Sequence, residues 1–227
     1  MNVVPEKTQL ETATLVSFRI CPFVARAQIV AFEKNVDLKT KFIDLNHKPD
    51  WYLKVSPTGT VPGLVLKDAF IFESTVIAEF IDELTQASLF PDDRVQKYLN
   101  KSWISFASTL IQHQYGQMIA SDKAGFSESR SSLAGAMARI EETIKSKPFY
   151  NGDDFHIIDA VYAPVLYRLQ LIKEKFGDTL IDDFPAIKNW ATATIDRPSV
   201  KAVLNAEFDA ALMVHLEEKH SWLLSNS

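Results

Sequence analysis

The single cysteine of the chain, Cys21, lies in a sequence context that favours nucleophilic sulfur chemistry. The preceding residues 14–19 have a strand-like pattern, and Pro22 follows, a residue suited to the first position of a helix. The unpaired N–H groups and partial positive charge of a helix N-terminus favour the thiolate form of a cysteine placed there. The alternative is an unreactive cysteine that packs as a small hydrophobic residue. The spacing alone does not choose between these two interpretations.

The residue three positions after Cys21 limits the reactions that the cysteine can complete. Dithiol oxidoreductases carry a second cysteine at that position, whereas this chain has Val24. A reactive Cys21 can attack a disulfide once, but no second thiol of the chain can then release the product. Turnover therefore requires an external thiol.

Three further segments contain residue types that could bind a small peptide-like anion. A cis bond at Val61-Pro62 would turn the Val61 backbone toward an extended ligand, although a trans proline is far commoner. Ser74 is expected to cap a helix whose N–H groups could receive a carboxylate, and Glu73 could hold an ammonium group. Lys48 could pair with a second carboxylate. Taken singly, each segment also fits an ordinary loop proline, helix cap or solvated lysine.

The composition narrows the possible partners. The 227 residues are 47% hydrophobic and 23% charged, as in globular proteins, and the net charge of −5 without a basic block argues against nucleic acid as a partner. No apolar run approaches the length of a membrane span, and no signal pattern opens the chain, so we expect no membrane partner and a cytoplasmic location. The five histidines and one cysteine show no metal-ligand spacing, so no metal is expected.

The pattern of elements predicts two domains. Strands are expected at 14–19, 38–43, 64–67 and 70–72, with helices at 22–34 and from 74, and with a loop over 46–63. This order implies a mixed sheet covered by helices in a domain of residues 1–85. After a linker at 86–93, only helical patterns remain, and residues 94–227 form an all-α domain. One of its helices, 157–176, is expected to begin with Asp159 reaching back to His156.

The combination of these motifs resembles the cytosolic glutathione transferases, in particular the cysteine-type branch that includes the omega class. The resemblance covers nearly the whole chain and rests on Cys21-Pro-Phe23, the segment 45–51, the segment 56–62, Glu73-Ser74 and looser matches in the helical part. It implies an α/β thioredoxin-like N-terminal domain plus an all-α C-terminal domain, which is the glutathione transferase fold. The family pattern has Ser or Thr at the position of His156, so the chain departs from it there.

The resemblance also implies roles for individual residues. Cys21 would form a mixed disulfide with glutathione, the cosubstrate. Val61 before Pro62 would pair with its cysteinyl part, Glu73 and Ser74 would hold the γ-glutamyl group, and Lys48 would face the glycyl carboxylate. The glutathione-binding residues implied in this way are Phe23, Leu45, Lys48, Val61, Pro62, Glu73 and Ser74. Helix phase and the omega pattern place Tyr115, Arg168 and Trp222 at the pocket of the second substrate.

The activity implied by a cysteine at this position is glutathione-dependent thiol transfer, that is, removal of glutathione from mixed disulfides or reduction of dehydroascorbate. A homodimer is expected from the resemblance. One alternative is a conjugating transferase of another branch that uses Ser17 or another hydroxyl near Cys21. A second alternative is a binding module of the same fold without catalytic activity.

Overall fold

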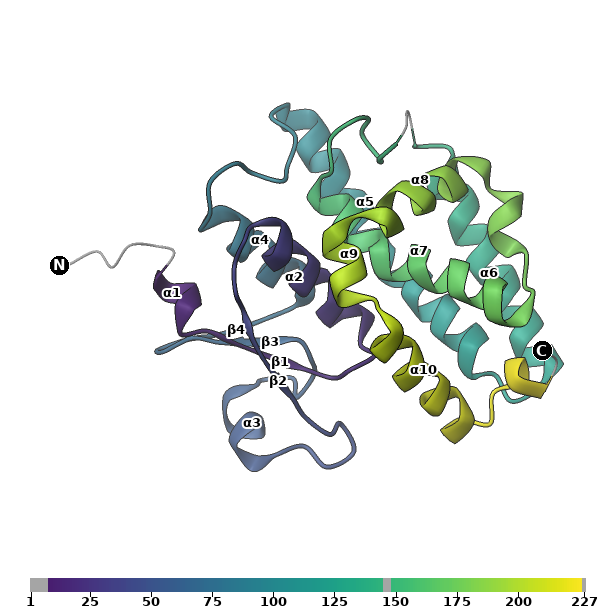
Figure 1. Cartoon of the computed structure of the whole chain (residues 1–227), viewed down its shortest axis with the longest axis horizontal. Coiled ribbons are helices and arrows are strands. Elements are labelled where there is room, and N and C mark those ends of the chain that lie inside the picture. Colours follow the sequence, from purple (N-terminus) through teal and green to yellow (C-terminus); the bar gives the residue numbers. More distant parts are fainter. Residues whose placement is uncertain (1–7, 145–147, 226–227) are drawn as a thin grey trace. The chain divides into compact units, whose positions relative to one another are not determined.

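The contacts in the computed structural model, which describes residues 8–144 and 148–225, divide the chain into two units after Leu89 (Figure 1). The first unit contains a small sheet and helices, and the described part of the second unit contains only helical elements and one isolated bridge, between Phe149 and Gly152. The division falls inside the segment 86–93.

The first unit is built on a four-stranded mixed sheet. Its strands are β1 (Thr14–Ser17), β2 (Lys39–Phe42), β3 (Gly63–Val65) and β4 (Phe70–Phe72), in the order β2-β1-β3-β4. β1 pairs in parallel with β2, with Thr14 opposite Lys39, and antiparallel with β3, with Thr14 opposite Val65. β3 and β4 form an antiparallel hairpin. The predicted mixed sheet is confirmed, and each strand lies within two residues of its predicted bounds.

Helices lie on both faces of this sheet. They are α1 (Thr8–Glu11), α2 (Pro22–Glu33), α3 (Asp50–Val55) and α4 (Ser74–Glu83). Figure 1 shows α2 and α4 on one side of the sheet and α3 on the other. Successive residues of a strand point to opposite faces, so Leu15 and Val16 can both be buried, and Val16 packs with Ile43 and with Tyr52 of α3. The loop predicted over 46–63 is wrong at α3, because six residues are too few to show a helical period.

The helices α2 and α4 pack together and are joined where they end. Lys34, directly after α2, places its Nζ 2.9 Å from Oδ1 of Asp82 in α4, and both side chains are buried. The same ammonium group donates to the carbonyl oxygens of Gln86 and Ala87, at 2.9 and 2.6 Å. Both helices begin near the cavity described below, so this ion pair stabilises the packing of the two elements that carry the candidate site.

The second unit is a helical bundle around α7. Its elements are α5 (Arg94–Ile119), α6 (Lys123–Glu141), α7 (Ile157–Phe176), η1 (Leu180–Asp183), α8 (Pro185–Asp196), α9 (Pro198–Val203), α10 (Ala206–Glu218) and η2 (Trp222–Ser225). α7 is buried along most of its length and contacts both α5 and α8. Its predicted bounds, with Pro164 inside the helix, are confirmed.

The start of α7 is stabilised by a buried carboxylate. Asp159 accepts hydrogen bonds from the backbone N–H groups of Tyr150 and His156, at 2.9 and 2.8 Å, and from Nε1 of Trp190 at 2.5 Å. The predicted contact of Asp159 with the His156 backbone is therefore confirmed. Complete burial raises the pKa of Asp159 to about 6, which outweighs the opposite effect of the three donors.

Candidate functional site

Cys21 is the residue at the N-cap of α2, as its sequence context predicts. Its backbone is extended, with φ −71° and ψ 116°, and Pro22 occupies the first helical turn. The side chain is half-buried, and Sγ lies 3.9 Å from the carbonyl oxygen of Val61, a residue forty positions later in the chain. The fold therefore places the thiol beside the segment that precedes β3.

Of the two geometries considered for the Val61–Pro62 bond, the structure has the cis one, and the bond borders a cavity in the first unit. The cavity has a volume of about 270 Å³. Its lining residues are Phe23, Thr60, Val61, Pro62, Glu73 and Ser74. Five of these six residues are among the seven that the sequence suggests for glutathione binding. The cavity thus brings together the start of α2, the segment before β3 and the start of α4.

The start of α4 differs in detail from the sequence-based expectation. Ser74 is the first residue of α4 and not its cap; the N-cap is Glu73, whose side chain makes no capping hydrogen bond. Glu73 has φ 71°, a left-handed conformation that costs a residue with a side chain about 1–3 kcal/mol. Such strain is commonly found where a binding site requires it. The exposed carboxylate of Glu73 and the N-terminus of α4 thereby border the same cavity.

Arg26 is a residue of this region that the sequence analysis did not identify. It lies on α2 and is 1% exposed, and its Nη1 is 3.4 Å from Oγ of Ser74. Its guanidinium group also lies 4.9 Å from the ring centroid of Phe23. Arg26 therefore brings a buried positive charge next to two residues that line the cavity. An arginine that directly follows the apolar residues 22–25 and precedes Ala27 was the available signal.

Tyr52 of α3 stabilises a backbone segment that lines the cavity. Its hydroxyl group donates to the carbonyl oxygen of Thr60 at 2.5 Å. Burial raises the pKa of this phenol and outweighs the opposite effect of a hydrogen bond with Ser56. Tyr52 thus holds the backbone immediately before Val61, a role that could not be inferred while residues 46–63 were interpreted as a loop.

Two of the predicted glutathione-site residues lie outside the cavity lining. Leu45, like Val61, packs against the core cluster that contains Val16 and Tyr52. Lys48 is half-buried beside Gly59, with its Nζ 3.7 Å from the position that a Cβ at Gly59 would take. The structure therefore places Leu45 on the core of the first unit and Lys48 in the loop between β2 and α3.

The three residues suggested for the second substrate lie at two separate places in the helical unit. The Tyr115 hydroxyl group is 3.1 Å from Nε2 of His215, and Arg168 is buried with its guanidinium group 5.7 Å from the ring centroid of Phe208. The pKa of His215 is lowered by burial and by the charges of Lys219 and Arg168, which places Arg168 near the Tyr115–His215 pair.

Trp222 is not part of that group. Its ring packs on Phe126 at a centroid distance of 4.7 Å and lines a separate cavity of about 200 Å³, together with Arg130 and Asp178. The residues that line this cavity include neither Tyr115 nor Arg168.

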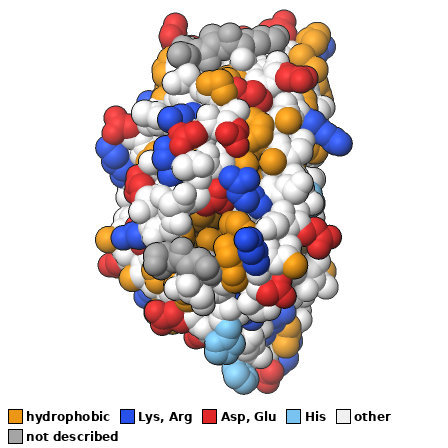
Figure 2. Space-filling model, turned by 90° about the vertical axis from the view of Figure 1, so that its right-hand side faces the viewer, with side chains coloured by type: hydrophobic (Ala, Val, Ile, Leu, Met, Phe, Trp, Pro, Cys, Tyr) orange, Lys and Arg blue, Asp and Glu red, His pale blue; other side chains and the backbone are white. Residues whose placement is uncertain are grey.

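The described residues contain no group of three or more His, Cys, Asp or Glu side chains that could hold a metal ion. In the same part of the chain, no helix is long and apolar enough to cross a membrane. On the face of the molecule in Figure 2, Lys and Arg side chains are interspersed with Asp and Glu side chains, and hydrophobic side chains are exposed in small groups.

Comparisons with known proteins identify the class to which this fold and site belong. A family model described as glutathione S-transferase, N-terminal domain, matches residues 20–84, and one described as glutathione S-transferase, C-terminal domain, matches residues 123–193. The probable glutathione S-transferase DHAR1, cytosolic, of Oryza sativa subsp. japonica is 32% identical over 183 residues, which cover 79% of this chain and 81% of the relative. The chain belongs to the glutathione S-transferase family.

Within the family, the similar proteins include members of the omega class and DHAR proteins. Glutathione S-transferase omega-1 of Sus scrofa is 27% identical over 191 residues, covering 82% of this chain and 78% of the relative. Among solved structures, glutathione transferase Omega 3C from Trametes versicolor has a TM-score of 0.75 at 20% identity and covers 87% of this chain and 92% of that chain. The resemblance to the cysteine-type, omega-like branch and the predicted fold are confirmed.

Proposed function

We propose that this chain is a glutathione-dependent thiol transferase in which Cys21 forms a mixed disulfide with glutathione. The observation that carries the proposal is the position of Cys21 at the N-cap of α2, with Sγ 3.9 Å from the Val61 carbonyl oxygen and next to a cavity that also includes the start of α4. The similarity to omega-class and DHAR relatives supports the same assignment.

The proposed reaction has two thiol–disulfide exchange steps. The Cys21 thiolate attacks the glutathione sulfur of a mixed disulfide, which forms the Cys21–glutathione disulfide and releases the substrate thiolate. A second glutathione thiolate then attacks that disulfide, releasing oxidised glutathione and restoring Cys21. The two steps balance in electrons and sulfur atoms because the second glutathione resolves the disulfide. No second cysteine of the chain is needed, which agrees with Val24 at the position where dithiol enzymes carry the resolving thiol. Dehydroascorbate is a further proposed substrate, reduced at the expense of two glutathione molecules.

The proposed roles of the cavity residues follow from the chemistry of glutathione, a peptide with two carboxylates and one ammonium group. The N-terminus of α4 at Ser74 binds the γ-glutamyl carboxylate. The buried positive charge of Arg26, next to Ser74, favours the same carboxylate. The exposed carboxylate of Glu73 binds the ammonium group. The backbone of Val61 pairs with the cysteinyl part, as in strand addition. Lys48 is proposed to bind the glycyl carboxylate from the neighbouring loop.

A steady-state assay of Cys21→Ala tests this proposal against conjugation by another branch. With a glutathione mixed disulfide as substrate, we expect at least a hundredfold loss of kcat/KM in Cys21→Ala and little change in Ser17→Ala. The hydroxyl group of Ser17 is buried and lies 3.4 Å from the carbonyl oxygen of Phe18, so it is poorly placed to activate glutathione. Retained disulfide reduction in Cys21→Ala would contradict the proposal. Conjugation of an aryl halide that depends on Ser17 would favour the other branch.

The proposed assembly is a homodimer with a cytoplasmic location. Val95, Tyr98 and Leu99, in the first two turns of α5, are 68%, 61% and 46% exposed. An exposed apolar surface of this kind supports contact with a second copy of the chain. Sedimentation equilibrium of the wild type and of Tyr98→Glu tests the proposal: the wild type should sediment as a dimer and the variant as a monomer. A monomeric wild type would contradict it.

A further inference from the structure

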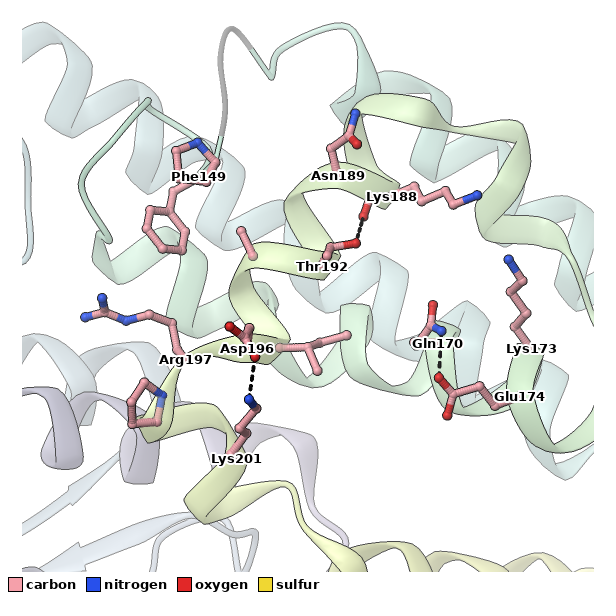
Figure 3. Close-up of a pocket in the computed structure, with 14 residues that line it drawn as sticks. Phe149, Gln170, Lys173, Glu174, Lys188, Asn189, Thr192, Asp196, Arg197 and Lys201 are labelled. Atoms are coloured by element: carbon pink, nitrogen blue, oxygen red, sulfur yellow. Dashed lines mark hydrogen bonds and ion pairs between the residues drawn. The ribbon is translucent and has the colours of Figure 1, made fainter.

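A cavity of about 850 Å³ lies within the helical unit and is lined by parts of α7, α8 and α9 (Figure 3). Its charged side chains are largely engaged with one another. Nζ of Lys173 and Nζ of Lys188 lie 2.7 and 2.6 Å from Oδ1 of Asp182, and Asp196 forms an ion pair with Lys201. This balance of charge gives no basis for assigning a ligand, whereas the smaller cavity of the first unit is lined by a polar group with a defined direction.

Two polar contacts join α2 to α4 at the same spacing along both helices. Near the cavity, Nη1 of Arg26 donates to Oγ of Ser74 at 3.4 Å, and farther along the two segments Lys34 pairs with Asp82. Each contact joins residues 48 positions apart. Eight residues therefore separate the two contacts along either segment, which corresponds to about 12 Å of helix. The two helices run in the same direction, so both begin at the cavity.

The contact near the cavity determines the direction of the Ser74 hydroxyl group. A guanidinium group has donors and no acceptor, so Oγ of Ser74 can only accept from Arg26. The hydroxyl proton must then point to another acceptor. Ser74 is the first residue of α4, and within the described part of the chain its hydroxyl group donates no hydrogen bond. The proton is therefore available to a ligand in the cavity that Ser74 lines.

The donors at this end of the cavity match a carboxylate. The first N–H groups of α4 have no partner within the helix, and the Ser74 proton adds a donor beside them. Arg26 is 1% exposed and Ser74 is 5% exposed, so little water reaches their contact. In such surroundings, a hydroxyl group that turned its lone pairs toward a carboxylate would weaken binding, because two acceptors would face each other.

We propose that Arg26 is a positioning residue for glutathione, which keeps the Ser74 hydroxyl group oriented as a donor toward the γ-glutamyl carboxylate. Arg26 acts through Ser74, and the contact gives the site a preference for an ionised carboxylate over a neutral group at the same position. The inference deepens the proposed function and rests on glutathione binding in this cavity.

Isothermal titration calorimetry with reduced glutathione tests the proposal in a double-mutant cycle. We expect Arg26→Met and Ser74→Ala each to weaken binding about tenfold, because a charge-assisted hydrogen bond to the ligand is misdirected or lost. The double variant should lose much less than the product of the two single losses, since Arg26 acts through Ser74. Arg26→Lys should stay within about threefold of the wild type, because an ammonium group also has donors only.

A modified ligand and a control variant isolate the role of the carboxylate. 4-Aminobutyryl-cysteinylglycine lacks only the α-carboxylate of glutathione, so Arg26→Met should weaken its binding little. The matched control is Lys34→Met, which removes the cation from the other contact between the two segments. Where its circular dichroism shows the native fold, it should bind glutathione as the wild type does. In steady-state assays, Arg26→Met should raise KM for glutathione and leave kcat nearly unchanged, which a general loss of fold would not do.

The outcomes separate this inference from the proposed function. Independent losses in the cycle, wild-type affinity in Arg26→Met, or an equal loss for glutathione and its analogue would overturn the inference and leave the proposed function intact. Absence of glutathione binding by the wild type would overturn both. If Arg26→Met does not fold, Arg26→Gln replaces it with the same expectation, because an amide can also accept from Ser74 and no longer fixes the direction of the hydroxyl group.

Discussion

Replacement of Lys34 by Met tests whether the buried ion pair stabilises the unit that carries Cys21. The substitution removes the ammonium group but leaves the Asp82 carboxylate, which is 2% exposed, with two neutral donors, Oγ of Ser88 and the N–H of Leu89, both at 2.8 Å. Removal of one partner from a buried pair costs about 3–5 kcal/mol, because the other charge remains buried without compensation. The total stability of a protein is about 5–15 kcal/mol, so the expected loss is large.

Urea unfolding followed by far-UV circular dichroism measures this loss, and a double-mutant cycle isolates its cause. Lys34→Met/Asp82→Leu should be more stable than the sum of the two single effects predicts, by at least about 1 kcal/mol, since no uncompensated charge remains. Lys54→Met, at an exposed lysine of α3, is the matched control and should change the free energy of unfolding by less than about 0.5 kcal/mol. A cost below about 1 kcal/mol for Lys34→Met, or strictly additive effects, would refute the reasoning.

Three further predictions concern pH, packing and backbone strain. Because the pKa of Asp159 is raised to about 6 in the fold, the native state binds the extra proton, and this contribution to stability is lost as the pH rises through 6. The free energy of unfolding of the wild type, measured relative to that of Asp159→Asn, should therefore be about 2 kcal/mol larger at pH 4.5 than at pH 7.5. A pH-independent difference would contradict the pKa. In Gly63→Ala, the new Cβ would lie 2.4 Å from Cζ of Phe70 and 2.6 Å from the Tyr52 hydroxyl oxygen, so we expect a loss of about 1–3 kcal/mol in urea unfolding; an unchanged midpoint would contradict this packing. Glu73→Gly should relieve the positive φ and raise the free energy of unfolding by about 1 kcal/mol while weakening glutathione binding in calorimetry, and lower stability with unchanged binding would contradict both parts.

The sequence predicts the fold well where its signals are long or chemically distinctive. The helix 157–176 matches α7 because a long, mainly apolar run follows a capping pattern. The strands of the first unit are predicted from short apolar runs between turn residues. α3 was missed because its six residues lie among proline-rich turns. The apolar spacing of Leu133, Met137, Ile140 and Ile144 predicts one helix over these residues, but α6 ends at Glu141. Apolar periodicity does not mark where a helix ends.

The site could be predicted only in part because side-chain burial depends on packing. Helix position is local, so the sequence placed Cys21 at a helix start and placed Glu73 and Ser74 at another. Which of these two residues caps α4 depends on the φ angle of Glu73, which the surrounding fold determines. Arg26 acts through Ser74, 48 residues later, and Tyr52 acts through the Thr60 carbonyl oxygen, eight residues later, and no single-sequence pattern reports these contacts.

The central claim is that Cys21 carries glutathione as a mixed disulfide, and intact-protein mass spectrometry tests it most directly. After incubation with oxidised glutathione and removal of the excess, the wild type should gain the mass of one glutathionyl group, and reduced glutathione should remove it. Cys21→Ala should gain nothing, while its unchanged circular dichroism shows that the fold is kept. A wild type that stays unmodified, or an adduct that reduced glutathione does not release, would contradict the account.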